Sequence, residues 1–412
     1  MRDILHSDLN NFYASVECKL NPAIKDKAVV VCGSIKDRHG IVLAKNQIAK
    51  QFGVKTGQTL WEVRNLVGNF PLVEKEANFS LYKQISKEVK SIYANYTDQV
   101  ESFGIDEAWL DVTGSGIFGT PRNIAKDISA KIKKQMGLTV SIGISFNKVF
   151  AKLGSDMKKP DAITEIPYSN FKQIVYPLPV SDLICIGKQT EKKLNKIGVE
   201  TIGDIETIGK PIMKNLLGKW GEYLYNFATG NDTSPVKKLG QHSEIKSVGN
   251  STTVYRDLHT ESEILSVISI LCDSISARLK QYDIYKAKTI GLCIKDFNLQ
   301  SYNKQTKLDF PSNNSLDFIL KAKQLLSTIW NYTPIRSIGV WVCDFIYETE
   351  QLSFFQEFQN QDKQYKLDKT ITQLKQKYGF SIIHRAIETI DEKIAMFNPK
   401  DDNTIHPVCF FA

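Results

Sequence analysis

Three acidic residues carry the clearest chemical signal in the sequence. Asp8 follows a short apolar run, and Asp106 and Glu107 lie together in a turn between two apolar segments of β type. A layered sheet brings such strand ends together, and three carboxylates at one edge suit Mg²⁺ or Mn²⁺. Two such ions activate an attacking hydroxyl and stabilise a leaving pyrophosphate. A lone acid in a turn is usually only a solvated side chain. The residues around the three acids must therefore decide whether they are metal ligands or ordinary turn residues.

The elements that must position these acids alternate between strands and helices over roughly the first 165 residues. This alternation predicts a layered α/β domain. Strands are expected at 4–5, 28–32 and 138–145 and on both sides of the turn within 99–111, and helices at 12–20, 41–52, 82–96, 125–135 and 148–157.

The remaining chain changes character twice. Residues 167–231 have a helical pattern with glycine-containing turns, and 233–241 has the composition of a linker. From 245 to 345 strands and helices alternate again, which predicts a second, smaller α/β domain. A glutamine-rich stretch and a last helical region, 366–378, follow. With 412 residues, two to four domains are expected.

Composition narrows the class of protein. The formal charge of +8 and the pI of about 8.9 suit a polyanionic partner. Seven scattered cysteines include no C-x-x-C pair, which disfavours a disulfide framework or a zinc site and fits a reducing cytoplasm. No apolar stretch approaches the ~18–20 residues that a membrane span needs, so no membrane association is expected.

Three longer motifs decide the interpretation of the acids. They are HSDLNNFYASVE at 6–17, GIDEAWLD at 104–111 and SIGISFNKVFAKLGSDMKKP at 141–160. In sequence, order and spacing they resemble the catalytic motifs of the Y family of translesion DNA polymerases, over residues 1 to about 345. The nearest branch resembles bacterial DNA polymerase IV, although Ala44-Lys45-Asn46 is closer to the polymerase V type.

The resemblance implies the reaction and its cofactors. Asp8 and Asp106 would bind two Mg²⁺ ions (Mn²⁺ is an alternative), Glu107 would bind the catalytic one, and the backbone carbonyl of Leu9 would be a further ligand. The expected activity is low-fidelity, template-directed DNA synthesis across damage, from dNTP to a primer 3′-hydroxyl, without proofreading.

The resemblance also implies the residues that hold the nucleotide. The backbone N–H groups of Asn10, Asn11 and Phe12 would cradle the triphosphate at a helix start, where plain capping by the two asparagines is the alternative. Tyr13 would be the steric gate against the 2′-hydroxyl, and its alternative is a half-buried core aromatic. Lys159 matches a triphosphate-binding lysine, and Lys50 falls where many relatives carry an arginine.

The expected architecture is a multidomain α/β right hand. The palm, with a mixed or antiparallel sheet, would be 1–18 and 78–168, and the small fingers would be 19–77. The helical thumb would be 169–235, a linker 236–244, the α/β little finger 245–346 and a tail 347–412. The resemblance implies one chain acting as a monomer on primer–template DNA in the bacterial nucleoid.

Two regions would hold the DNA. Residues 183–190, with Cys185 in place of a glycine, resemble a helix-hairpin-helix, a motif that binds phosphates without reading sequence. A second such turn is expected at 217–221. The residues predicted to contact DNA in the hairpin and in the little finger are Ile186, Gly187, Lys188, Thr190, Lys246, Ser247, Asn250 and Arg336.

A short peptide after the little finger resembles the motif by which bacterial polymerases dock on the sliding clamp. Its residues are Gln351, Leu352, Ser353, Phe354 and Phe355, with Phe354 where leucine is usual. The alternative is that its phenylalanines simply pack in a core.

Two other functions compete with polymerisation. A catalytically inactive relative that serves as a DNA-binding accessory factor would have lost the acids, yet all three are present. A nucleotide cyclase also carries paired carboxylates on a similar sheet, but it needs no hairpin, little finger or clamp peptide.

Overall fold

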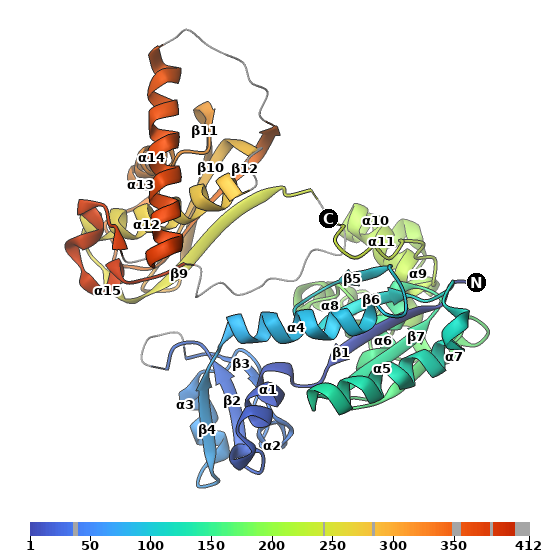
Figure 1. Ribbon diagram of the computed structural model, residues 1–412. Helices are drawn as coiled ribbons and strands as arrows, with labels where there is room; N and C mark the ends of the chain where they lie inside the picture. Colours follow the sequence, from blue (N-terminus) through green and yellow to red (C-terminus); the bar gives the residue numbers. More distant parts are fainter. Residues whose placement is uncertain (36–39, 242–243, 282–284, 348–355, 380–381, 400–412) are drawn as a thin grey trace. The chain divides into compact units, whose positions relative to one another are not determined.

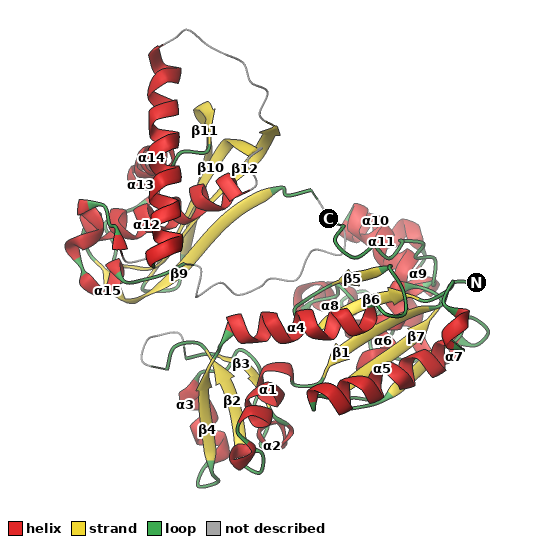
Figure 2. Ribbon diagram, viewed as in Figure 1, coloured by secondary structure: helices red, strands yellow, loops and turns green. Residues whose placement is uncertain are grey.

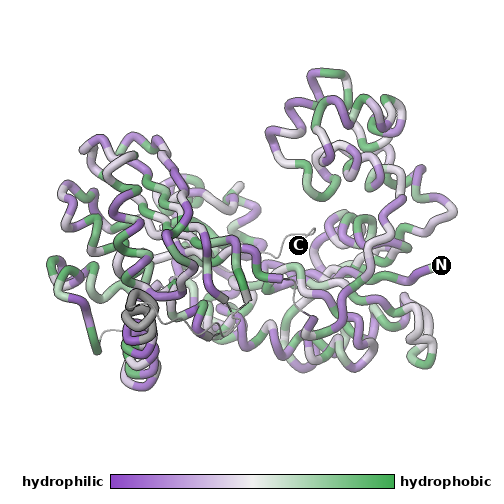
Figure 3. The backbone as a smooth tube through the Cα atoms, turned by 90° about the horizontal axis from the view of Figure 1, so that it is seen from above, coloured by the Kyte–Doolittle hydropathy of each residue, from purple (hydrophilic) through white to green (hydrophobic). Residues whose placement is uncertain are grey.

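The structure is a computed structural model of the whole chain, and it describes residues 1–35, 40–241, 244–281, 285–347, 356–379 and 382–399 (Figure 1). Contacts divide the chain into two compact units, one built mainly from residues 1–242 and the other mainly from 243–404. The peptide 351–355 and the apolar end 407–411 lie outside the described residues. No helix of the described residues combines the length and apolar composition needed to span a membrane, and polar residues interrupt the apolar stretches (Figure 3).

The first unit is organised around a five-stranded sheet (Figure 2). Its order is β5 (Val100–Ser102), β6 (Glu107–Asp111), β1 (Ile4–Leu9), β7 (Val140–Ser145) and β8 (Ile163–Ile166). The central strand β1 pairs antiparallel with β6 and β7, and β7 pairs parallel with β8. The sheet is therefore mixed, as the sequence predicts.

Helices cover both faces of this sheet. α4 (Phe79–Tyr93) and α5 (Pro121–Met136) share one apolar core with β1, β6 and β7. α6 (Lys148–Met157) packs on the other face, where Gly143 of β7 is required. A Cβ on Gly143 would lie 1.9 Å from the carbonyl oxygen of Ala151 in α6. This close contact fixes α6 beside the end of β1 that carries Asp8.

A smaller layered part inserts between β1 and α4. After α1 (Phe12–Leu20) and a 3₁₀ turn at Pro22–Ile24, three strands pair in the order β3 (Val42–Lys45), β2 (Ala28–Cys32) and β4 (Leu72–Glu76). α2 (Gln47–Gln51) and α3 (Leu60–Val67) complete its core.

The predicted helix over 41–52 is wrong in its first half, which forms β3. Asn46 causes the break: its backbone is extended, and its side-chain oxygen accepts from the N–H groups of Ala49 and Val29. The residue thus caps α2 and ties it to β2 at once. Gly53 then takes a positive φ of 81° after the helix, as expected.

Short helices follow the sheet in the first unit. They are α7 (Phe171–Val175), α8 (Lys188–Asn195), α9 (Ile202–Ile208), α10 (Lys210–Leu217) and α11 (Lys219–Ala228), with 3₁₀ turns at Gly116–Phe118 and Val180–Asp182 elsewhere in the unit. The linker expected at 236–244 begins as a packed segment. Val236 is buried against Ile4 and Trp109, and the N–H of Leu239 donates to the carbonyl of Asp98.

The second unit is a four-stranded antiparallel sheet with helices on one face. Its order is β11 (Ser301–Ser312), β10 (Tyr285–Asp296), β12 (Ile335–Tyr347) and β9 (Ser247–Leu258). α12 (Glu261–Gln281) and α13 (Ser315–Ile329) supply the rest of its core.

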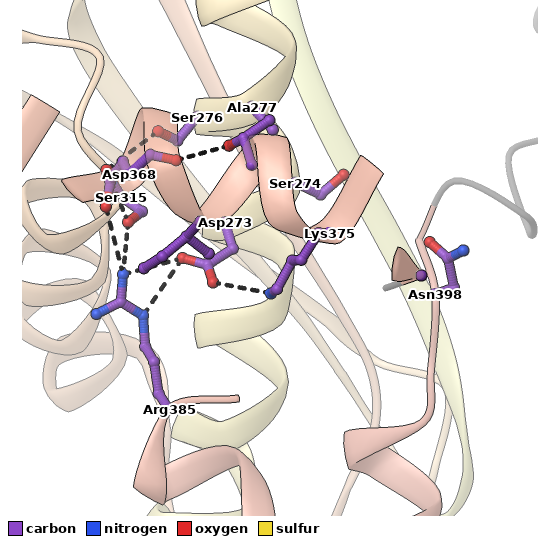
Figure 4. Close-up of a pocket in the computed structure, with 12 residues that line it drawn as sticks. Asp273, Ser274, Ser276, Ala277, Ser315, Asp368, Lys375, Arg385 and Asn398 are labelled. Atoms are coloured by element: carbon purple, nitrogen blue, oxygen red, sulfur yellow. Dashed lines mark hydrogen bonds and ion pairs between the residues drawn. The ribbon is translucent and has the colours of Figure 1, made fainter. Parts of the chain in front are cut away.

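The C-terminal helices dock on this second unit through buried charges. They are α14 (Gln356–Tyr378), a 3₁₀ turn at Ala386–Ile390 and α15 (Glu392–Ala395). Asp368 of α14 pairs with Lys280 of α12 at 2.9 Å. Arg385 pairs with Asp273 at 3.1 Å (Figure 4). The cavity beside these pairs has a volume of about 260 Å³. Because its acidic and basic groups already pair with one another, we assign this cluster to anchoring α14.

Candidate active site

Asp8, Asp106 and Glu107 converge at one end of the five-stranded sheet. Asp8 in β1 lies directly opposite Glu107, the first residue of β6. Asp106 occupies the turn before β6, and its carbonyl accepts a 3.0 Å hydrogen bond from the N–H of Leu9. Strand pairing thus holds together acids that are far apart in the sequence.

A cleft of about 310 Å³ opens beside these acids, within the first unit. Most of the residues that the sequence singles out for metal and nucleotide binding line it, and Glu107 and Tyr13 are the exceptions. The lining residues are Asp8, Leu9, Asn10, Asn11, Phe12, Leu43, Ala44, Lys45, Gln47, Lys50, Thr56, Asp106, Lys159 and Pro160.

The acids repel one another in this partly buried setting. Burial raises the pKa of Asp106 to about 6, and the charges of Asp8 and Glu107 add to the rise. Burial also raises the pKa of Asp8, although the ammonium of Lys159 opposes this. A cation bound at this point would relieve the repulsion between the carboxylates.

Glu107 is held differently from the two aspartates. Burial would raise its pKa, but the adjacent ring of His6 and the positive charge of Lys152 outweigh burial and lower the pKa to about 2. Lys152 Nζ lies 2.6 Å and His6 Nε2 3.3 Å from the same oxygen, Oε2. Ser155 fixes the other ring nitrogen of His6 at 2.8 Å. The second carboxylate oxygen, Oε1, is left out of these contacts.

The donor set at this site fits divalent metal ions. Three carboxylates and the nearby backbone supply hard oxygen ligands, and the described residues that line the cleft include no cysteine. Within the described part of the chain, no three His, Cys, Asp or Glu side chains already surround a single point. Lysine ammonium groups neutralise Asp8 and Glu107 instead, at 2.7 and 2.6 Å.

The start of α1 lines the cleft without a side-chain cap on its first amides. Asn11 adopts a left-handed conformation with φ of 50° and makes no side-chain capping bond. The side chain of Asn10 turns away, donating to Ser141 and accepting from the N–H of Asp161 at 2.7 Å. Simple capping by these asparagines is therefore not what the structure contains. The first amides of the helix are free of side-chain caps, as an anion site requires. The N–H of Asn10 is the exception to the expected cradle, because it donates to the carbonyl of Thr139 at 2.9 Å.

Tyr13 stands on an aromatic support. Its ring stacks on Tyr82 with centroids 4.3 Å apart and an interplanar angle of 13°, and Phe79 meets it edge-on at 5.9 Å. Burial raises the pKa of Tyr13 to about 12, and the charge of Asp106 contributes, which places the phenol near the acids. Tyr82 is itself anchored by its hydroxyl, which donates to Glu17 at 2.7 Å.

Three basic residues line the same cleft as the acids, Lys45, Lys50 and Lys159. Lys159 bridges Asp8 and Asp156, at 2.7 and 2.8 Å. Lys50 of α2 lines the same cleft, together with Lys45, which sequence reasoning did not single out as a site residue. Burial lowers the pKa of Lys45, and the charge of Lys50 adds to the effect, so the two ammonium groups lie close enough to repel.

The hairpin predicted at 183–190 has the expected turn. Cys185 takes a positive φ of 71°, the conformation that glycine adopts most easily, and α8 begins at Lys188 directly after Gly187. Ile186 is buried in the core of the short helices. The expected second turn is formed by Gly218, with φ of 65°, between α10 and α11.

The predicted DNA contacts of the second unit fall on different sides of its sheet. Ser247 is exposed on the face away from α12 and α13. Asn250 lies on the helix-covered side, where it donates to Ser274 of α12 at 2.7 Å and accepts from Arg278 at 2.9 Å. These internal bonds weigh against a phosphate contact by Asn250. Lys246 immediately precedes β9, and Arg336 lies near the start of β12.

The charge repulsion at the acids predicts a trade-off between function and stability. The pKa of Asp106 is about 6 in the folded protein against an ordinary 3.8. The contribution of this carboxyl group to the free energy of unfolding is therefore fully present below about pH 4, where the group is protonated, and is lost as the pH rises through 6. We expect metal-free Asp106→Asn to melt a few °C above the wild type at pH 7.5, with the gap closing toward pH 4. Thermal melts across this pH range test the expectation, and added Mg²⁺ should stabilise the wild type more than the variant. A variant that melts lower at pH 7.5 would contradict it.

Known proteins and families match this chain along most of its length. Residues 7–156 match the impB/mucB/samB family, 245–354 its C-terminal domain, and 181–232 the thumb domain described for DNA polymerase-iota. A DNA polymerase IV of Acetivibrio thermocellus is 45% identical over 390 residues, 94% of this chain and 97% of that protein. DNA polymerase IV 1 of Bacillus subtilis is 34% identical and covers 93% of this chain and 92% of its own length.

Solved structures agree on the fold. A Y-family DNA polymerase chimera, Dbh-Dpo4(243-245)-Dbh, superposes with a TM-score of 0.73 at 23% identity, covering 84% of this chain and all of that one. The expected right-hand α/β fold is thereby confirmed. The chain belongs to the DNA polymerase IV branch of the Y family, the DNA-directed DNA polymerases of translesion synthesis.

Proposed function

We propose that the cleft at the end of the five-stranded sheet is the nucleotidyl-transfer site of this polymerase. One observation carries the proposal: Asp8, Asp106, Lys50 and Lys159 line a single cleft although they come from four separate parts of the sequence. Paired acids for cations and lysines for phosphates are the two chemical requirements of phosphoryl transfer.

Asp8, Asp106, Glu107 and the carbonyl of Leu9 would hold two Mg²⁺ ions, or Mn²⁺ in their place. Bound there, the ions would activate the primer 3′-hydroxyl and neutralise the leaving pyrophosphate. Glu107 is suited to its part because Lys152 and His6 engage only Oε2 and hold the carboxylate ionised. Oε1 is then the oxygen that remains for a ligand.

Lys159, Lys50 and the start of α1 would receive the dNTP triphosphate. Lys159 now neutralises Asp8. A cation bound by Asp8 would release this ammonium for a phosphate. Asp8 would then pair with the cation and Lys159 with the triphosphate. The uncapped amides at Asn11 and Phe12 add donors at the positive end of a helix.

The domain assignments extend this proposal. The five-stranded sheet would be the palm (1–18 and 78–168), and the inserted three-stranded part the fingers (19–77). The short helices (169–235) would be the thumb, followed by the linker (236–244), and the second unit the little finger (245–346) with the tail 347–412. The hairpin residues Ile186, Gly187, Lys188 and Thr190 would bind phosphates of the duplex without reading sequence.

Primer extension tests the proposal directly. Purified protein with Mg²⁺, dNTPs and a primer–template should add nucleotides to the primer, and it should continue past a template lesion that stops a replicative polymerase. EDTA should stop the reaction. Tight binding of primer–template without extension at any Mg²⁺ or Mn²⁺ concentration would refute this site and favour a non-catalytic accessory role.

The peptide Gln351–Phe355 would dock on the sliding clamp. Leu352, Phe354 and Phe355 offer apolar anchors, and a tether raises the effective concentration of the polymerase at the primer end. We expect Gln351→Ala with Phe354→Ala and Phe355→Ala to keep unstimulated extension but lose stimulation by a loaded clamp. Extension assays with and without clamp measure this, and a lowered melting temperature would instead assign the phenylalanines to a core.

The enzyme would act as a monomer in the bacterial nucleoid.

A further inference from the structure

The four-stranded sheet of the second unit has two unlike faces. Alternate residues such as Ile290, Leu292 and Val340 point into the core under α12 and α13. The residues between them form the other face, here called the outer face. It consists of every second residue of the four strands. These are 289, 291, 293 and 295 in β10, 301, 303, 305 and 307 in β11, 337, 339, 341 and 343 in β12, and 247, 249, 251 and 253 in β9. Its members on β9 and β11 are mostly exposed.

A single tryptophan lies in the middle of the outer face, between two glycines. One row of paired residues runs Gln305, Gly291, Trp341 and Gly249 across the sheet. A Cβ on Gly291 would lie 2.1 Å from ring atoms Cε2 and Cζ2 of Trp341, and a Cβ on Gly249 would lie 2.7 Å from its Cβ. Glycine at these two positions therefore lets the indole lie against the backbone of the sheet.

The other paired residues of the outer face are small, polar or basic. They include Ser, Thr, Asn, Gln and Cys, with Lys295 and Lys307 as the charged members and no acid among them. Two acids of these strands already have partners: Asp344, next to Cys343 in β12, accepts from Thr289 of the outer face, and Asp309 of β11 pairs with Lys321 of α13. This distribution of charge suits a phosphate backbone.

We propose that Trp341 is an apolar contact for the sugar–phosphate backbone of primer–template DNA on the outer face. The inference rests on the proposed function of the second unit as a DNA-holding little finger. An indole held against the sheet offers a broad apolar surface to the deoxyribose rings between phosphates, while lysine and hydroxyl groups take the phosphates themselves. Such a contact gives affinity without counterion release, so it persists at salt concentrations that weaken the lysine contacts.

Salt-dependent binding of the full chain to labelled primer–template separates the two kinds of contact. Trp341→Ala should weaken binding about ten-fold at every salt concentration and leave the slope of log K against log salt unchanged. Trp341→Phe should recover most of the loss because a flat ring remains. Lys307→Ala should make the slope shallower by about 0.9.

Lys304→Ala is the matched control for Lys307→Ala. Both lysines are exposed on β11, but Lys304 pairs with Leu292 in a row of the opposite face, so it should leave the slope unchanged. Emission of Trp341 provides a second readout. DNA should quench part of the wild-type tryptophan fluorescence, and this part should be missing in Trp341→Phe.

The outcomes distinguish this inference from the proposed function. Wild-type affinity in folded Trp341→Ala, or unchanged quenching in Trp341→Phe, would overturn the inference while primer extension stands. A change of slope in Trp341→Ala would also overturn it, since the contact would then be electrostatic. If Trp341→Ala fails to fold, the Trp341→Phe quenching still decides. Absence of extension by the wild type would refute the proposed function alone.

Discussion

Glu107→Gln is expected to slow nucleotide incorporation by at least about 10³-fold and to leave primer–template affinity within about two-fold. The substitution preserves size and shape but removes the charge that Lys152 pairs with and that would hold the metal ions of the proposed site. Lys152 Nζ lies 2.6 Å from Oε2, so the variant also leaves this partly buried ammonium with only the more distant carboxylate of Asp156, at 3.8 Å. DNA affinity should survive because the proposed DNA contacts lie in the hairpin and the second unit. Single-turnover extension at saturating dNTP and DNA binding by anisotropy measure the two quantities.

Asp111→Asn is the matched control for this experiment. Asp111 lies at the opposite end of the same strand, β6, and its carboxylate accepts from the backbone and hydroxyl of Thr113. An amide oxygen can accept both bonds, so incorporation should change little. Substantial extension by Glu107→Gln, or an equal loss in Asp111→Asn, would remove Glu107 from the catalytic set.

The convergence of the three acids could be anticipated because sequence motifs fix both residue type and position along a strand. Asp8 was expected to follow a strand and Glu107 to lie in a turn. In the structure β1 extends through Leu9 and β6 begins at Glu107, so antiparallel pairing makes the two acids direct neighbours. The support of Glu107 was not anticipated. His6 and Lys152 lie inside the quoted motifs, but which of many motif side chains reach one carboxylate oxygen depends on the packing of α6 at Gly143.

Structure and prediction also differ where a residue type is compatible with two local structures or with two faces of a strand. The run from 41 to 52 is helical by composition, yet Asn46 satisfies two segments at once and divides it into β3 and α2. In β9, asparagine at position 250 is a residue type that suits phosphate binding. The face of the sheet on which its side chain lies depends, however, on the strand register. Asn250 pairs with Val340 of the core row and therefore faces α12. Register is a property of the assembled sheet that residue type alone does not set.

Tyr13→Ala is expected to raise the ratio of ribonucleotide to deoxynucleotide incorporation by about two orders of magnitude. In the proposed mechanism the ring stands where the 2′-hydroxyl of an incoming ribonucleotide would lie, and selection comes from the clash. A gate of this kind must not move aside. The stack on Tyr82 at 4.3 Å and the edge contact with Phe79 at 5.9 Å supply that rigidity.

Two further variants separate the gate from a general packing role. Tyr13→Phe keeps the ring and should keep the wild-type ratio, because the clash depends on the ring and not on the hydroxyl. Tyr82→Ala removes the support beneath the gate and should raise the ratio to an intermediate value. The ratio is measured as kcat/KM for a ribonucleotide and its matching deoxynucleotide opposite the same template base. If Tyr13→Ala lowers both rates equally and leaves their ratio unchanged, the ring is only part of the core, and discrimination against the 2′-hydroxyl resides in another residue of the cleft.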